Sequence, residues 1–206
     1  MTRDHWWWRP GWRKGRSFYT WHTTFSSSNP IRQIVSSYAP IISGISTLDP
    51  VKIDGIHLTL QGVGFTDEVS SADINGIVAS TLPRCAQLGP INARMDEPRI
   101  DEEAVHVNVH PIEQIAYVKL ALRNGIGDVW GHENVPESMD GFRPHITLAY
   151  SNGVASIGHI DAAIKKCSLP VADVLISSVS LIKLNRDRGR YEWTEVATVT
   201  LGRDPR

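Results

Sequence analysis

The sequence predicts an α+β fold, and three observations support that class. Segments in which apolar and polar residues alternate, typical of strands, are interspersed with segments whose apolar residues recur every three or four positions, typical of helices. The composition of the 206-residue chain, 41% hydrophobic and 21% charged, is that of a soluble globular protein. No linker or low-complexity tract divides it, so we expect a single domain over residues 17–206, preceded by an arm at residues 1–16.

The arm is set apart by its charge and its tryptophans. Five basic residues and one acidic residue give it +4, which leaves −5 on the remainder of a chain whose net charge is −1. Its tryptophans are Trp6, Trp7, Trp8 and Trp12. Two interpretations stay open: indoles that cover an apolar edge, which we favour, or a surface that stacks bases and holds phosphates. A globally basic surface, expected of a duplex-DNA binder, is absent.

Strands are predicted where β-branched and aromatic residues alternate with polar ones. The segment at 102–111 alternates most regularly, with three valines facing the core and His106, Asn108 and His110 facing outward. By the same criterion strands are expected at residues 17–25, 51–65, 102–111 and 142–153, and a hairpin from the runs 171–184 and 191–201 joined at residues 185–190. Gly62 and Gly64 indicate a turn after the second of these segments.

Helices are predicted by the three- and four-residue spacing of apolar side chains. The spacing is clearest at 112–130, where Ile115, Val118, Leu122 and Ile126 fall on one face. Further helices are expected at residues 31–42, 70–82 and 157–167.

One short motif occurs twice within predicted strands. A histidine, an apolar residue and a threonine begin at His57 and again at His145, 88 residues later, so that Thr59 and Thr147 share a strand face with their histidines. A neutral imidazole can take a proton while a protonated one gives a proton, because the ordinary pKa of histidine is about 6.5. Threonine hydroxyls can hold phosphate oxygens. Facing each other across a cleft, the copies would catalyse phosphoryl transfer without metal or covalent intermediate.

With these motifs the sequence resembles the 2H phosphoesterases, and among them the bacterial 2′-5′ RNA ligase family, relatives of RNA 2′,3′-cyclic phosphodiesterases. The segments FYTWHTTF at 18–25 and YEWTEVATVTL at 191–201 support the resemblance. It implies a bilobal α+β fold, with two antiparallel sheets flanking a central cleft and helices on the outside. It also implies that His57 and His145 are the catalytic acid/base pair and that Thr59 and Thr147 bind phosphate.

The reaction implied by the resemblance opens a 2′,3′-cyclic phosphate, at an RNA end or in a small cyclic nucleotide, to a 2′-phosphate with no cofactor. We favour His57 as the acid and His145 as the base, although the residues themselves do not assign these roles. Two other functions stay open: reversible 2′-5′ ligation of RNA ends, and a non-catalytic module that binds RNA ends or nucleotides. The expected partner is the RNA or nucleotide substrate, with no membrane and no obligate protein partner, and a monomer is expected.

Four further residues are candidates for supporting the cleft: His22, Gln61, Arg143 and Tyr150. His22 shares one face of a predicted strand with Thr20 and Thr24, and a purely structural role explains it about as well as cleft support does.

Several other side chains are expected to have no catalytic role. A solvated strand face explains His106 and His110 better than metal ligation, because a third ligand is missing, and we expect no metal site. Solvated turn charge explains Arg186, Arg188 and Arg190 at the hairpin tip better than the alternative, contact with single-stranded RNA. Cys85 and Cys167 are expected to be reduced thiols in a cytoplasmic protein, since neither a signal peptide nor a membrane span is evident.

Overall fold

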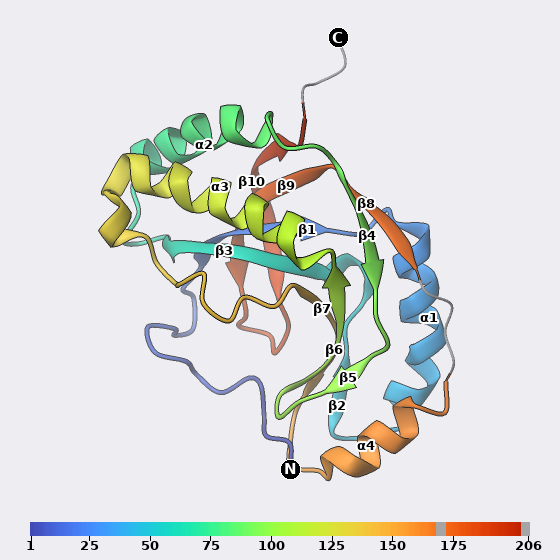
Figure 1. Cartoon of the computed structure of the whole chain (residues 1–206). Helices are drawn as coiled ribbons and strands as arrows, with labels where there is room; N and C mark the ends of the chain where they lie inside the picture. The colour runs from blue at the N-terminus through green and yellow to red at the C-terminus, as the bar shows by residue number, and fades with distance from the viewer. Residues whose placement is uncertain (168–171, 203–206) are drawn as a thin grey trace.

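A curved antiparallel sheet runs through the molecule (Figure 1). The computed structural model describes residues 1–167 and 172–202. The strands follow the order β10-β9-β1-β3-β7-β6-β4-β8, with β2 added beside β7 and β5 beside β6. Their bounds are β1 Phe18–Thr24, β2 Leu48–Pro50, β3 His57–Phe65, β4 Ile91–Met95, β5 Arg99–Ile100, β6 Ala104–His110, β7 His145–Ser151, β8 Asp173–Ile176, β9 Ser178–Asn185 and β10 Glu192–Thr200.

The sheet has two halves, which meet where β3 lies beside β7. In the described part of the chain these two strands pair at one register position, Leu58 opposite Ile146, and both of these side chains are fully buried. One half holds β10, β9, β1 and β3, and the other holds β7, β6, β4 and β8. The α+β class and the bilobal arrangement are therefore confirmed, and the two predicted sheets are halves of one continuous sheet.

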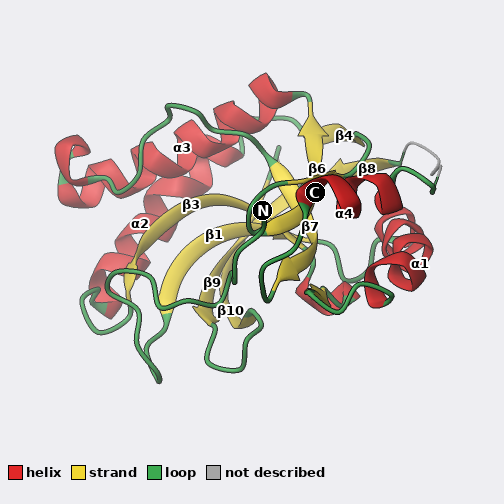
Figure 2. Ribbon diagram, turned by 90° about the horizontal axis from the view of Figure 1, so that it is seen from below, coloured by secondary structure: helices red, strands yellow, loops and turns green. Residues whose placement is uncertain are grey.

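In the part of the chain that the structure describes, four α-helices cover the sheet: α1 (Asn29–Ser43), α2 (Ser71–Cys85), α3 (Ile112–Trp130) and α4 (Ile157–Ile164). The pair α2 and α3 packs over the half with β3 and β10, whereas α1 and α4 lie beside the other half (Figures 1 and 2). Serine side chains cap the first turn of α1, α2 and α4, at Ser28, Ser70 and Ser156. The helix predicted at 112–130 has the bounds of α3. No helix among the described residues has the length and apolar character needed to cross a membrane.

The structure corrects the predicted strand at 51–65. Residues Ile53–Gly55 form a turn of 3₁₀ helix, and the strand begins only at His57. Gly62 and Gly64 lie inside β3 rather than in a turn. A Cβ on Gly62 would lie 2.6 Å from the Glu137 carboxylate, so this glycine permits the close approach of another segment.

The predicted hairpin is present as β9 and β10, but the run that precedes it is divided. Residues Asp173–Ile176 form β8, which pairs with β4 in the other half of the sheet, and Ser177 separates it from β9. Residue 171, the first of the predicted run, lies outside the described residues. Both stretches alternate in the same way, so periodicity alone did not separate them.

Candidate active site

Both histidine-threonine motifs line one cavity of about 490 Å³. The pairing of Leu58 with Ile146 explains how they meet. Side chains alternate along each strand, so burying these two central residues turns His57, Thr59, His145 and Thr147 towards the opposite face. An antiparallel pair has local two-fold symmetry, so each half of the sheet contributes one histidine and one threonine to the same cavity.

The two imidazoles are held in the same way. Nδ1 of His57 donates to the carbonyl of Gly55 at 2.8 Å, and Nδ1 of His145 donates to the carbonyl of Arg143 at 2.9 Å. In each case the acceptor lies two residues before the histidine. A proton fixed on Nδ1 leaves the lone pair of Nε2 to act in proton transfer.

The environments of the two histidines differ. Burial lowers the pKa of His57 to about 4, an effect that its hydrogen bond to Gly55 opposes and the charge of His145 assists. His57 is therefore neutral near pH 7 in the free protein. The side chain of His145, the first residue of β7, is exposed.

His22, on β1, lies directly against the first motif. It pairs with Thr59 across the strands, its Nε2 lies 3.2 Å from the Thr59 hydroxyl oxygen, and its ring stacks on that of His57 with centroids 4.4 Å apart. It is 1% exposed, and burial lowers its pKa well below the ordinary value. The imidazole of His22 thus orients a threonine that faces the cavity.

His22 also leaves one buried ring atom unpaired, Nδ1. A buried N–H without an acceptor is rarer than a buried acceptor without a donor. The favoured tautomer therefore carries the proton on Nε2, which donates to the Thr59 oxygen. The Thr59 hydroxyl proton is then available to a ligand in the cavity.

The second motif has a corresponding neighbour, His106 on β6. His106 pairs with Thr147 across the strands, as His22 pairs with Thr59, and its ring centroid lies 5.4 Å from that of His145. It is half-buried, Asp101 lies 3.5 Å from its Nδ1, and burial lowers its pKa. The prediction of a solvated histidine is corrected at this position: 19% of the His106 side chain is exposed, because its ring packs against that of His145.

His110 differs from His106. It is the last residue of β6, 41% of its side chain is exposed, and its Nε2 lies 2.8 Å from the Asp96 carboxylate. Within residues 1–167 and 172–202, no group of three or more His, Cys, Asp or Glu side chains is arranged to hold a metal ion.

The other predicted support residues lie in three different places. Tyr150 lines the cavity, with its ring stacked on that of His5 at 4.1 Å. Gln61 is fully buried and does not line the cavity. Its amide nitrogen donates to the carbonyl of Pro136, and its amide oxygen accepts from Lys119. Arg143 contributes its backbone carbonyl, which holds His145.

The arm at residues 1–16 lies along the cavity and supplies part of its wall. His5, Arg9 and Trp12 all line it. Glu103 holds this segment through His5 at 3.1 Å, the Trp7 indole at 3.2 Å and an ion pair with Arg9. The sequence interpretation missed these contacts, because they join residues about a hundred positions apart.

Arg186 fixes the arm from the other side. The prediction of a solvated arginine was wrong: Arg186 is 3% exposed, and its guanidinium donates to the carbonyls of His5 and Trp7 at 2.9 and 3.2 Å. The same guanidinium lies over the rings of Trp6 and Tyr191. The peptide on both sides of Trp6 is therefore clamped to the hairpin.

Comparison with known structures identifies the fold. TT0787 of Thermus thermophilus matches with a TM-score of 0.70 and 16% identity, over 91% of this chain and 100% of its own. Escherichia coli LigT, solved in complex with 3′-AMP, matches with a TM-score of 0.67 and 16% identity, over 91% and 99% of the two chains. A conserved protein of unknown function from Agrobacterium tumefaciens, ATU0111, matches with a TM-score of 0.57 and 16% identity, over 88% and 85%.

Sequence comparison identifies the family. The search of curated proteins finds no match. A family model described as the 2′-5′ RNA ligase superfamily matches residues 52–188, more than half of the chain, and this range contains both motifs. The chain therefore belongs to the 2′-5′ RNA ligase superfamily of 2H phosphoesterases.

Proposed function

We propose that the protein is a phosphodiesterase that opens 2′,3′-cyclic phosphates, at RNA ends or in small cyclic nucleotides, to 2′-phosphates. One observation carries the proposal: His57 and His145 line one cavity, each with its proton fixed on Nδ1 by a backbone carbonyl. Two such imidazoles supply the acceptor and the donor that hydrolysis of a phosphodiester requires.

The reaction proceeds by displacement at phosphorus. A water oxygen attacks the phosphorus atom while Nε2 of one histidine takes the water proton. The bond between phosphorus and the ribose 3′ oxygen breaks, and Nε2 of the other histidine gives a proton to that oxygen. The hydroxyls of Thr59 and Thr147 hold the non-bridging oxygens as negative charge builds on them. These groups suffice without a metal or a covalent intermediate.

When the substrate binds, His57 takes up from solvent the proton that it would donate. Burial keeps this imidazole neutral in the free protein. A bound phosphate brings a negative charge into the same cavity, which raises the pKa of the adjacent imidazole. We assign His57 as the acid on the 3′ oxygen and His145, exposed at the end of β7, as the base on water.

The description of the matched family favours a second candidate, reversible 2′-5′ ligation of RNA ends. A ribose 5′ hydroxyl takes the place of water as the nucleophile, the bond between phosphorus and the 3′ oxygen breaks, and the product is an RNA joined by a 2′-5′ phosphodiester. The two imidazoles keep their roles in ligation and exchange them in the reverse cleavage.

The test is hydrolysis of an oligoribonucleotide that ends in a 2′,3′-cyclic phosphate, followed by phosphorus NMR with EDTA present. The wild-type protein should form a 2′-phosphate, and His57→Ala and His145→Ala should each lose about 10²- to 10⁴-fold in rate. The matched control is His159→Ala, an exposed histidine on α4. A wild-type protein that binds the oligonucleotide without turnover would overturn the proposal in favour of a binding module.

A further inference from the structure

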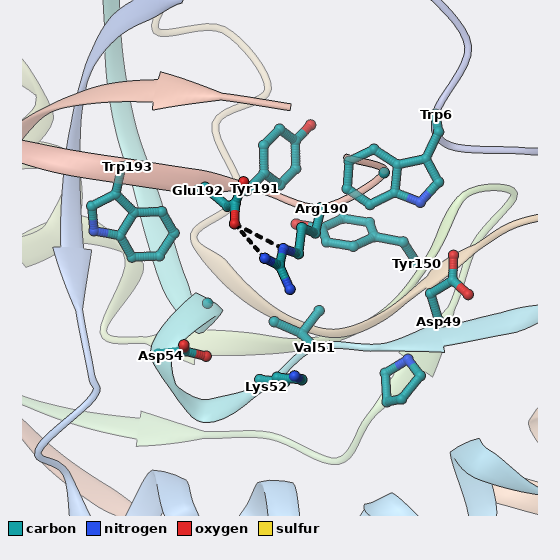
Figure 3. Close-up of a pocket in the computed structure, with 13 residues that line it drawn as sticks. Trp6, Asp49, Val51, Lys52, Asp54, Tyr150, Arg190, Tyr191, Glu192 and Trp193 are labelled. Carbon is teal, nitrogen blue, oxygen red and sulfur yellow. Dashed lines mark hydrogen bonds and ion pairs between the residues drawn. The ribbon is translucent and has the colours of Figure 1, made fainter. Parts of the chain in front are cut away.

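A second cavity, of about 410 Å³, adjoins the first. We call it the tryptophan pocket, and in Figure 3 Trp6 and Trp193 stand on opposite sides of it, with Arg190 between them. Tyr150 and Tyr191 line both cavities and form the wall between them. The residues that line the tryptophan pocket come from the arm, from β2 and the segment that joins it to β3, from β7 and from the hairpin of β9 and β10.

Aromatic rings connect the tryptophan pocket to His57. The ring centroid of His57 lies 5.4 Å from that of Trp193 and 5.8 Å from that of Tyr191. Tyr191 in turn lies 5.3 Å from Trp6 and 5.4 Å from Tyr150. The carbonyl that holds His57 belongs to Gly55, which also lines the pocket. The two cavities are close enough to take neighbouring parts of one ligand.

The pocket combines aromatic rings with side chains of both charges. Trp6, Tyr191 and Trp193 are each only partly buried, so their rings present area on which a base can stack. Lys52 lines the same space and can hold a backbone phosphate, whereas Arg190 is paired with Glu192, and Asp49 and Asp54 complete the charged lining. Its volume lies within the range of about 300–1,000 Å³ typical of small-ligand sites.

The arm side of the pocket is held in place before any ligand binds. Arg186 donates to the carbonyls on both sides of Trp6, those of His5 and Trp7. The Trp6 ring also packs against Tyr150 at 5.2 Å. A ring fixed in this way loses little conformational entropy when a base stacks on it, which favours binding.

We propose that the tryptophan pocket binds a nucleobase of the substrate RNA, that of the nucleotide preceding the reacting end, stacked on the ring of Trp6 in the space between Trp6 and Trp193. This inference rests on the proposed function, because it takes the reacting phosphate to lie in the first cavity. The wall formed by Tyr150 and Tyr191 separates the two cavities, so the base belongs to the next nucleotide along the strand rather than to the one that reacts. The protein would then prefer RNA ends over cyclic mononucleotides.

The test compares three substrates that end in a 2′,3′-cyclic phosphate: a mononucleotide, a dinucleotide, and a dinucleotide whose first residue is abasic. The variant is Trp6→Ala, and the matched control is Trp8→Ala, an exposed tryptophan of the same arm that lines neither cavity. Losing one stacked base should cost about 5- to 150-fold in kcat/KM.

We expect kcat/KM of Trp6→Ala to fall by this factor, relative to the wild-type protein, with the dinucleotide and not with the mononucleotide. For the wild-type protein, kcat/KM should be lower by the same factor with the abasic dinucleotide than with the normal one. Trp6→Ala should not distinguish the abasic dinucleotide from the normal one, Trp6→Phe should restore most of the preference, and Trp8→Ala should behave as wild type. Equal losses on mononucleotide and dinucleotide would show that Trp6 supports only the fold of the arm, and would overturn the inference. An unchanged preference of Trp6→Ala for the dinucleotide over the mononucleotide would also overturn the inference.

Failure of the proposed function gives a different result. If the wild-type protein hydrolyses none of the three substrates, the proposed hydrolysis fails, and the pocket is tested by equilibrium binding of a dinucleotide that ends in a 3′-phosphate. Weaker binding by Trp6→Ala, with Trp8→Ala unchanged, would support the pocket. Equal binding by all three proteins would overturn it.

Discussion

The imidazole rings of His22 and His57 lie face to face, with centroids 4.4 Å apart and planes within 5° of parallel. Both side chains are buried, and burial lowers the pKa of both, so two neutral rings stack where a pair of charged rings would repel each other. The stack places Nε2 of His22 at 3.2 Å from the hydroxyl oxygen of Thr59. His22 therefore contacts both members of the first motif.

His22→Phe should keep a ring against His57 and lose the contact to Thr59. Activity should fall about 2- to 10-fold, the value of one hydrogen bond, because the threonine hydroxyl is no longer oriented. The measurement is kcat in a double-mutant cycle with Thr59→Val, in which the effect of His22→Phe should disappear. An equal loss in both backgrounds would mean that His22 acts only through packing.

The pH dependence of kcat/KM should be bell-shaped, with its acidic limb near pH 4. The reactive form of the free protein carries one proton on the pair formed by His57 and His145. A second proton inactivates it, and the pKa for taking up this proton is that of His57, about 4. The profile is measured with a cyclic mononucleotide from pH 3.5 to 9. An acidic limb near 6.5 would contradict the burial of His57 described above.

The free energy of unfolding should fall as the pH drops from about 6.5 to 4. His5 and His57 have pKa values of about 4 in the folded protein and about 6.5 when unfolded, so the unfolded chain binds more protons in this window. The contribution of the two neutral histidines to the free energy of unfolding is fully present above pH 6.5. By pH 4, protonation of each histidine lowers the free energy of unfolding by at most about 3 kcal/mol. Urea denaturation at several pH values checks this: His57→Asn should flatten the slope, and His159→Asn should leave it unchanged.

A leaving group that needs no proton should identify the acid. With a p-nitrophenyl ester of a nucleoside 2′-phosphate, His57→Ala should recover most of the activity that it loses on a cyclic phosphate, while His145→Ala should stay impaired. Initial rates of p-nitrophenolate release measure this directly. Recovery by His145→Ala instead would exchange the two assignments.

Arg186→Ala should release the arm. The variant loses both hydrogen bonds to the carbonyls of His5 and Trp7, and limited trypsin digestion should then cut after Arg13 and Lys14 at least 10-fold faster than in the wild-type protein. Arg188→Ala is the matched control, because Arg188 is exposed at the same hairpin tip. Equal cleavage rates in both variants would show that the other contacts suffice to hold the arm.

The sequence predicted those elements whose burial pattern repeats over many residues. The alternation of Val105, Val107 and Val109 gave β6 its correct faces, and the apolar residues of α3 gave its bounds. The paired motifs pointed to the cavity that contains both histidines, because the two-residue strand period alone places His57 with Thr59. The roles of these residues in catalysis stay predictions.

Other features depend on contacts between distant segments, which local periodicity does not encode. The short strands β2, β4 and β5 exist because neighbouring strands offer free edges to pair with. Arg186 resembles its neighbours at the hairpin tip, and only the docking of the arm buries it. His106 alternates away from the core as predicted, yet it is half-buried, because the ring of His145 packs against it.

The pairing of Leu58 with Ile146 sets the separation of the two histidines, since it joins the halves of the sheet between them. Neither side chain touches the cavity, and both are fully buried. A change in volume at either position would tilt one motif against the other, and a displacement of about 1 Å in a catalytic group can cost about 100-fold in rate. Evolutionary constraint at this site should therefore extend to two aliphatic residues that perform no chemistry.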